Sequence, residues 1–182
     1  MLETDRLLLR QWVEEDFDLF AKMCSNERVM EFFPNTQTRE ESYEMARKIQ
    51  SLINERGWGL WAIEVPSRYK FIGFIGLHTP QCNMPFSPCV EVGWRLSNQY
   101  WGKGYATEGA KAALEFAFNI LKLNEVVSFT TVGNVRSEAV MKKIGMHNSG
   151  HNFMHPNIEQ SHPQCEHILY KINQSEWRQT TL

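Results

Sequence analysis

A short glycine-rich turn constrains this chain more than any other feature of its sequence. The turn Gln99-Tyr100-Trp101-Gly102-Lys103-Gly104 lies between a strand-like run, residues 90–96, and a helix-like run that begins at Tyr105. Glycines let a backbone approach a ligand closely, and the unpaired N–H groups of a first helical turn point toward an anion. The sequence therefore predicts that backbone N–H groups bind a pyrophosphate at this strand-to-helix junction.

Two other phosphate-binding motifs do not fit this turn. A Walker A loop ends in Lys-Ser or Lys-Thr, which is absent here. A dinucleotide fingerprint needs a third glycine where the chain has Thr107, and an acidic residue near Ser128 or Phe129. Without further support, a single Gly-x-Gly pair indicates no more than a turn.

A second strand-to-helix junction follows downstream. The run from Asn134 to Met146 comes directly after an apolar strand-like segment, residues 126–132. Asn134 is a good helix N-cap, Ser137 lies in the first turn, and Gly145 suits the left-handed residue that ends a helix. An ordinary capped amphipathic helix has the same pattern, so this junction alone indicates no function. The occurrence of two such junctions in this order is the more specific signal.

The rest of the chain alternates between strand-like and helix-like segments. Apolar periodicity predicts strands at residues 6–12, 60–65, 71–77, 90–96, 126–132 and 166–172, and helices at residues 14–25, 38–56, 105–121 and 134–145. Thr38 and Glu41 form a capping box at the start of the clearest helix, and Gly57 ends it. Strands that later alternate with helices predict an α/β or α+β mixed sheet wrapped by helices.

The two junctions together resemble the two signatures of the GNAT family of N-acetyltransferases. In that family a Gln-x-x-Gly-x-Gly loop binds the pyrophosphate of acyl-CoA, and an Asn-x-x-Ser helix follows. The whole chain, from Leu2-Glu3-Thr4-Asp5-Arg6-Leu7 to the last strand, is most similar to the branch that acetylates ribosomal-protein N-termini. The resemblance implies one GNAT domain over residues 1–182, with a mostly antiparallel twisted sheet of six to seven strands flanked by about four helices.

The resemblance also implies acetyl-CoA as co-substrate, without a metal. In the family, the strand before the loop and the next strand diverge, and the pantetheine arm of the coenzyme lies between them. The expected cofactor-binding residues are Val92, Trp94, Gln99, Trp101, Gly102, Lys103, Gly104, Tyr105, Ala106, Thr107, Asn134 and Ser137. Gly93 lies where a β-bulge or a close ligand would be useful, although a strand glycine also simply weakens a strand.

Acetyl transfer requires a neutral amine, a polarised thioester carbonyl and a stabilised leaving thiolate. Glu91 is the leading candidate for the general base, because strand alternation places it on one face with Gly93 and Arg95. An exposed glutamate that pairs with Arg95 is the alternative. A histidine or a water molecule could then act as the base.

The leaving thiolate lacks its usual proton donor. Many family members carry a tyrosine near the end of the helix that corresponds to residues 134–145, where this chain has Met141. A thioether donates no proton. The resemblance makes Ser137 the second catalytic candidate, as a hydrogen-bond donor to the sulfur. A first-turn serine that bonds to the helix backbone explains Ser137 equally well.

Histidines gather near the C-terminus. Five of the six histidines lie between His147 and His167, and three of them are spaced by four residues, which on a helix would suggest a metal site. Gly150 and Pro156 argue against that helix, so no metal is expected and solvated or locally bonded histidines are favoured. The resemblance implies a substrate-side loop for similar segments of relatives. The resemblance makes Phe32-Phe33-Pro34 an apolar wall of the acceptor site.

Composition narrows the possible functions. A net charge of −2 gives no electrostatic case for nucleic-acid binding. No run of about 20 apolar residues suggests a membrane span, and the acidic start at Met1–Asp5 does not resemble a signal peptide. Four cysteines without a C-x-x-C pair favour reduced thiols in the cytoplasm. The expected oligomeric state is a monomer or homodimer.

The resulting expectation is an acetyl-CoA-dependent N-acetyltransferase in which a primary amine attacks directly. The expected acceptor is the N-terminal amine of a peptide or protein. A small-molecule amine, such as a polyamine, an aminoglycoside or an amino acid, is the first alternative. A non-catalytic acyl-CoA-binding sensor is the second, because Met141 replaces the usual tyrosine.

Overall fold

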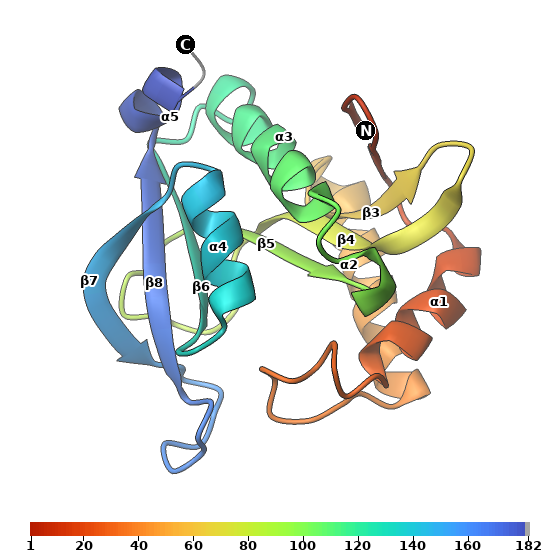
Figure 1. The fold of residues 1–182 in the computed structure, drawn as a ribbon, viewed down its shortest axis with the longest axis horizontal. Helices are drawn as coiled ribbons and strands as arrows, with labels where there is room; N and C mark the ends of the chain where they lie inside the picture. Colours follow the sequence, from red (N-terminus) through yellow and green to blue (C-terminus); the bar gives the residue numbers. More distant parts are fainter. Residues whose placement is uncertain (181–182) are drawn as a thin grey trace.

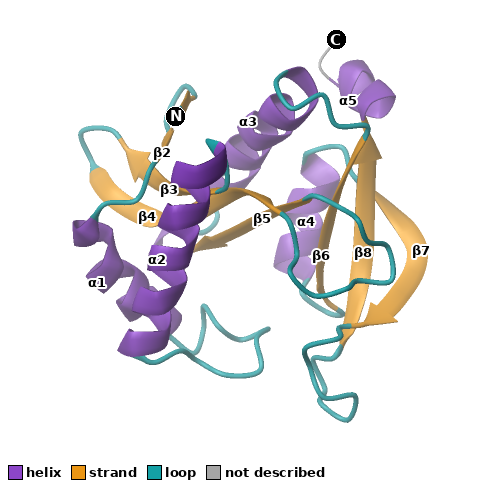
Figure 2. Ribbon diagram, turned by 180° about the vertical axis from the view of Figure 1, so that it is seen from behind, coloured by secondary structure: helices purple, strands orange, loops and turns teal. Residues whose placement is uncertain are grey.

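The sheet is organised around one fully covered strand. The computed structural model describes residues 1–180, and in it β4 (Tyr69–His78) lies between β3 (Leu60–Val65) and β5 (Glu91–Leu96). Every residue of β4 from Phe71 to Leu77 is buried, because helices cover both faces of the sheet here. Figures 1 and 2 show α1 and α2 on one face and α3 on the other.

Eight strands form a single sheet in the order β1-β2-β3-β4-β5-β6-β8-β7. The other strands are β1 (Leu2–Glu3), β2 (Leu8–Arg10), β6 (Glu125–Thr131), β7 (His147–Met154) and β8 (Glu166–Asn173). All neighbours are antiparallel except β5 and β6, which are parallel and share one paired position, Glu91 with Val127. The sheet is therefore split beyond this pair, and β5 runs away from β6 as it approaches the glycine turn (Figure 1).

The helices are α1 (Glu14–Cys24), α2 (Arg39–Arg56), α3 (Tyr105–Asn119), α4 (Val135–Lys143) and α5 (Gln174–Thr180), with a 3₁₀ turn η1 (Asn98–Tyr100). The capping box of Thr38 and Glu41 is present, and Gly57 ends α2 with a φ of 79°. Helix α3 lies very close to β4, because a Cβ added at Gly109 would lie 2.5 Å from the Ile75 Cδ1 atom. This contact fixes the start of α3 against the centre of the sheet.

The mixed, mostly antiparallel fold is as expected, and the numbers of elements differ. Among the described residues there are eight strands and five α-helices, rather than six to seven and about four. The strand expected over residues 6–12 is shorter, and a turn separates β1 from β2. That turn is closed by the Thr4 N–H, which donates to the Leu7 carbonyl at 2.9 Å, and by the Leu7 N–H, which donates to the Thr4 hydroxyl at 3.0 Å.

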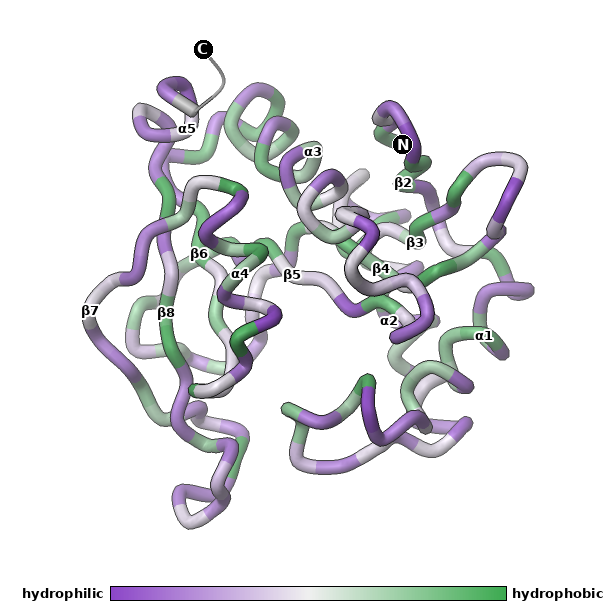
Figure 3. The backbone as a smooth tube through the Cα atoms, in the orientation of Figure 1, coloured by the Kyte–Doolittle hydropathy of each residue, from purple (hydrophilic) through white to green (hydrophobic). Residues whose placement is uncertain are grey.

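Hydropathy distinguishes the edge strand β7 from the central strands of the sheet. Strands β3 to β5 are rich in apolar residues, whereas β7 and the loop after it are mostly hydrophilic (Figure 3). Strand β7 is an edge strand with no fully buried residue, so apolar periodicity gave no sign of it. No helix in the described part of the chain has the length and apolar character needed to cross a membrane.

Candidate active site

The split between β5 and β6 opens into a cleft of about 1000 Å³. One end lies at the glycine turn and α4, and the other lies beneath α2, the loop after α1 and the loop before β5. We call these the turn end and the α2 end. The cleft brings together, from the expected site residues, Glu91, Trp94, Trp101, Gly102, Gly104, Ala106, Thr107, Asn134 and Ser137.

The turn end is built from backbone. Gly102 and Gly104 have φ angles of 74° and 82°, which glycine adopts without strain, and Gly104 is the N-cap of α3. The first i to i−4 hydrogen bond of this helix runs from the Glu108 N–H to the Gly104 carbonyl at 3.0 Å. The N–H groups of residues 105–107 therefore have no carbonyl partner within the helix. A Cβ built at Gly102 would meet no atom of the described residues within 4 Å, so the space beside this glycine is open to an anion.

Side chains hold the turn in place from outside the cleft. Arg6 donates from Nη1 to the Lys103 carbonyl at 3.0 Å and from Nε to the Glu108 carboxylate at 2.7 Å. The Trp101 indole N–H donates to the Leu96 carbonyl at 2.8 Å. The backbone donors are therefore fixed before any ligand binds, which is the arrangement that anion binding favours.

Beyond Glu91, the cleft edge of strand β5 has no strand partner within residues 1–180. Its other edge pairs regularly with β4, from Gly73–Leu96 to His78–Glu91, so the β-bulge expected at Gly93 is absent. A Cβ built at Gly93 would meet only the Glu91 carboxyl, 3.6 Å from Oε1. Open space at Gly93 and a free strand edge at Val92 and Trp94 fit an extended ligand that bonds to strand backbone.

The second junction forms the opposite wall. Asn134 accepts from the Ser137 N–H at 3.3 Å, and its amide donates to the Thr130 hydroxyl at 2.8 Å and the Ser137 hydroxyl at 3.3 Å. No acceptor for the Ser137 hydroxyl proton is found within residues 1–180, so this proton is available to the cleft. Met141 is 1% exposed and provides no donor at the position where the family often has tyrosine.

Glu91 lies where β5 and β6 separate. Its carboxyl group lines the cleft and makes no hydrogen bond or salt bridge within the described residues. Burial raises the pKa of Glu91 from 4.5 to about 8, because the charged form loses water without gaining a donor. A carboxyl group with this pKa can accept a proton near neutral pH and release it again.

Arg95 follows Glu91 on the same strand face but does not pair with it. Its Nη1 lies 3.2 Å from the Cys24 sulfur and 3.5 Å from the Gln37 Oε1 atom. The guanidinium carbon is 4.2 Å from the centre of the Phe33 ring and 5.5 Å from that of Phe74. The expected alternative, in which Arg95 neutralises Glu91, is therefore not seen.

Two of the five C-terminal histidines, His155 and His167, belong to a cluster of aromatic rings. The rings in mutual contact are Phe86, Phe129, Phe153, His155 and His167. Burial lowers the pKa of both histidines, so both are neutral at pH 7. The described residues contain no group of three or more His, Cys, Asp or Glu side chains arranged to hold a metal ion.

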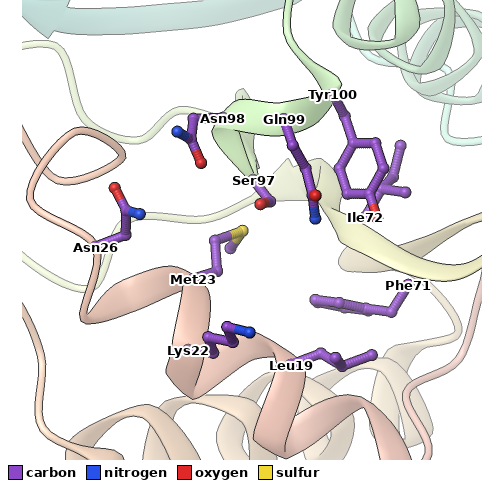
Figure 4. Close-up of a pocket in the computed structure, with 10 residues that line it drawn as sticks. All are labelled: Leu19, Lys22, Met23, Asn26, Phe71, Ile72, Ser97, Asn98, Gln99 and Tyr100. Atoms are coloured by element: carbon purple, nitrogen blue, oxygen red, sulfur yellow. The ribbon is translucent and has the colours of Figure 1, made fainter.

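Four expected cofactor residues do not line the cleft. Val92 is buried beneath it, while Lys103 and Tyr105 lie on the turn and face elsewhere. Gln99 points into a separate cavity of about 230 Å³ between α1, β4 and η1 (Figure 4). A glutamine in a motif gives no sign of which side of a 3₁₀ turn it faces.

Sequence reasoning also missed residues that line the cleft. Arg136 contacts three groups across the turn end: the Glu31 carboxylate at 2.5 Å, and the rings of Trp101 and Phe32. Thr131 donates to the Phe32 carbonyl at 3.2 Å. These contacts bring the loop after α1 across to α4 and β6. Nothing in the local pattern around Arg136 predicts a partner so distant in sequence.

The family model described as the acetyltransferase (GNAT) domain matches residues 6–147. The chain belongs to the GNAT family. This acetyltransferase is 35% identical over 188 residues to the FsC-acetyl coenzyme A-N(2)-transacetylase of Aspergillus fumigatus, covering 97% of this chain and 77% of the relative. It is 27% identical over 185 residues to the uncharacterized N-acetyltransferase YnaD of Bacillus subtilis, covering 97% and 98%. The protein is an N-acetyltransferase.

Solved structures of acetyltransferases with different names share this fold. A GNAT-family acetyltransferase from Bacillus anthracis has a TM-score of 0.78 at 24% identity, with 95% of this chain and 98% of that one covered. A ribosomal-protein-S5-alanine acetyltransferase from Vibrio fischeri has a TM-score of 0.74 at 18% identity, with 97% of both chains covered. A spermidine N-acetyltransferase from Vibrio cholerae, solved with CoA and spermine, has a TM-score of 0.72 at 19% identity, with 96% of this chain and 99% of that one covered. Both acceptors accompany this fold, so the fold does not establish the ribosomal-protein branch.

Proposed function

We propose that the protein transfers the acetyl group of acetyl-CoA to the N-terminal amine of a peptide or protein. One observation carries the acetyl-CoA part of this proposal: a single cleft joins the backbone turn at Gly102–Gly104 to a carboxyl group at Glu91. Between the two, the free edge of β5 provides backbone groups for a long, extended ligand. Acetyl-CoA has this form, with a pyrophosphate at one end and a thioester at the other.

Each part of the cleft has a proposed role toward acetyl-CoA, which supplies an activated acetyl group when bound. The amides from Gly102 to Thr107 hold the pyrophosphate, including those of Lys103, Tyr105 and Ala106. Strand backbone at Val92 and Trp94 holds the pantetheine arm, while Trp101 and Asn134 line its path. We leave Gln99 out of this set, because its side chain lies in the other cavity.

Glu91 and Ser137 have the proposed catalytic roles. The acceptor nitrogen loses a proton to Glu91 as it bonds to the acetyl carbon, and the carbon–sulfur bond breaks. The Ser137 hydroxyl then donates a hydrogen bond to the leaving sulfur, and Asn134 orients that hydroxyl by donating to its oxygen. A pKa of about 8 for Glu91 is close to that of an α-amine, so proton transfer between them is nearly balanced.

A small amine is the second candidate acceptor. The name of the Aspergillus relative specifies an N(2) amine, and a cleft of about 1000 Å³ has the size of a small-molecule site. The proposed location is the cytoplasm, which four free cysteines favour. The proposed oligomeric state is a monomer or homodimer.

The test is release of the CoA thiol from acetyl-CoA, measured with a panel of amines. Short ribosomal-type N-terminal peptides should give the largest kcat/KM, ahead of spermidine, an aminoglycoside and free amino acids. A small amine that reacts faster than every peptide would replace the acceptor and keep the chemistry. Tight CoA binding in calorimetry without turnover of any amine would instead favour an acyl-CoA sensor.

A further inference from the structure

The charges that line the cleft are strongly one-sided. Five cations line it, namely Lys48, Arg56, Arg95, Arg136 and Lys143, and Glu91 is the acid among the lining residues. Of these cations, Arg136 alone forms a salt bridge within residues 1–180. Glu91 is mostly uncharged below a pKa of about 8, so it offsets little of this positive charge at neutral pH.

The pKa of His78, at the α2 end, is affected by this positive charge. His78 lines the cleft opposite Glu91 in the sheet. Burial lowers its pKa first, and the charges of Arg56 and Lys48 lower it further. His78 is therefore neutral at pH 7. An acceptor with several positive charges would be repelled by the same lysine and arginine side chains.

Arg95 has an unusual set of contacts for a partly buried guanidinium. Its Nη1 contacts only neutral groups, Cys24 and Gln37, and burial raises the pKa of the Cys24 thiol despite the nearby charge. Its Nε is buried without a partner, and no partner of Nη2 is found in the described part of the chain. Nε and Nη2 together form the side edge of the guanidinium that binds a carboxylate through two parallel hydrogen bonds.

A buried guanidinium nitrogen without a hydrogen-bond partner, on a residue that lines a cleft, is costly unless a ligand completes it. Glu91 and Arg95 lie on one face of β5, four residues apart, or about 13 Å between their Cα atoms. The Glu91 Oε1 atom lies 3.6 Å from a Cβ built at Gly93, so this carboxyl leans along the strand in the direction of Arg95. A span of at most about 13 Å corresponds to a short peptide segment, at about 3.3–3.6 Å per extended residue.

We propose that Arg95 binds a carboxylate of the acceptor, and that the acceptor is an amine with a carboxylate one to three residues away rather than a polyamine. This inference rests on the proposed acetyltransferase site. Two sources supply this chemistry: the free C-terminus of a short peptide, or an acidic side chain close to a protein N-terminus. Phe33 and Phe74, which flank the guanidinium, hold it in place for that contact.

The test compares three matched tripeptides with the same N-terminal residue. The first is Xaa-Ala-Ala with a free C-terminus, the second is its C-terminal amide, and the third is the amide of Xaa-Ala-Glu. The acid should exceed the plain amide by about 10–100-fold in kcat/KM, as expected for a bidentate charged pair. If the Glu-containing amide recovers this gain, the carboxylate comes from a side chain; if only the free acid does, it comes from the C-terminus.

Variants then assign the preference to Arg95. Arg95→Gln should remove it by slowing the acid and leaving the plain amide within about threefold, with CoA affinity unchanged. Arg56→Gln, another cation of the cleft, is the matched control and should keep the preference. Arg95→Lys retains the charge without the paired edge, so it should reduce the preference even if Arg95→Gln does not fold.

Three results would overturn the inference. They are equal rates for acid and amide in the unaltered protein, equal losses for both in Arg95→Gln, or spermidine as the best acceptor. If no amine is acetylated, calorimetry of the same peptides with the CoA-bound protein takes the place of kinetics. Tighter binding of the acid than the amide then supports the role of Arg95 even though the proposed activity has failed.

Discussion

The two ends of the cleft are built in different ways. The turn end consists of the backbone of one continuous segment, Gly102–Thr107, held by Arg6 and by the indole of Trp101. The α2 end consists of side chains from segments far apart in sequence, including α2, the loop after α1, β5 and the loop before β8. A ligand common to a family fits a backbone site, whereas a ligand that differs between members requires side chains that can change.

If this comparison is correct, changes at the α2 end should alter turnover without altering CoA binding. The largest effect is expected for Glu91→Gln, which keeps the size of the side chain but removes the base. We expect kcat to fall roughly 10²–10⁴-fold, with the calorimetric affinity for CoA unchanged. Activity within a few-fold of the unaltered protein would assign the proton to water or to His155.

The pH dependence sharpens the same test. The kcat of the unaltered protein should rise with pH around the Glu91 pKa of about 8, since the base must be ionised to accept a proton. In Glu91→Gln this rise should be absent from kcat at saturating acceptor. A profile that is unchanged by the substitution would show that another group titrates.

Changes at the turn end should have the opposite signature. Gly102→Val places a side chain in the open space beside the amides and forces a φ of 74° on a β-branched residue. We expect CoA to bind on the order of 100-fold more weakly by calorimetry, as loss of several backbone contacts implies.

Gly150→Val is the matched control for strain. Gly150 has a φ of 78° and no neighbour within 4 Å of a built Cβ, but it lies in β7, away from the cleft. Both variants should lose similar stability in thermal unfolding, of about 1–2 kcal/mol. Equal CoA affinities in the two variants would mean that the turn does not bind the pyrophosphate.

The difference between the ends also explains what the sequence could predict. The turn, its glycines and the caps at Thr38 and Asn134 are local, because a few neighbouring residues determine their geometry. The open space beside Gly93 is local as well, whereas the absence of a bulge depends on pairing with β4. Local patterns therefore predicted the glycine turn and the two caps, but not that Val92, Gln99, Lys103 and Tyr105 lie outside the cleft lining.

The α2 end required tertiary contacts that no pattern encodes. Arg95 was expected on the face of Glu91, which is correct, but its contacts with Cys24 and Gln37 come from positions 71 and 58 residues away. Strand β7 and helix α5 were missed because each has few apolar residues and gains its order from β8. Pairing between distant segments, rather than propensity, forms these parts.

A third and smaller effect concerns stability rather than catalysis. The folded protein holds the Glu91 pKa at about 8, above its ordinary value of 4.5, so the folded state binds more protons than the unfolded state between these values. Stability from this group is complete below about pH 4.5 and is lost as pH rises toward 8. The stability advantage of Glu91→Gln over the unaltered protein should therefore grow by roughly 4 kcal/mol as the pH rises from about 5 to about 9.

Thermal unfolding of both proteins across this range measures the difference. Glu44→Gln, an exposed glutamate of α2, is the control and should run parallel to the unaltered protein. If Glu91→Gln also runs parallel, the Glu91 carboxyl is better hydrated than its position indicates. The catalytic prediction above would then lose its pH midpoint but not its direction.

The smallest effect is expected at Ser137, where the two readings of one hydroxyl can be separated. The Ser137 hydroxyl accepts from Asn134 at 3.3 Å and keeps a free proton on the cleft side, whereas the Ser42 hydroxyl donates to the Thr38 carbonyl at 2.8 Å inside α2. Removing one hydrogen bond to a leaving thiolate should lower kcat about tenfold. Ser137→Ala should show this loss with little change in unfolding temperature, and Ser42→Ala should show the reverse. If both serines lower only stability, the sulfur leaves without help from the protein, and Met141 marks a real loss of acid catalysis in this chain.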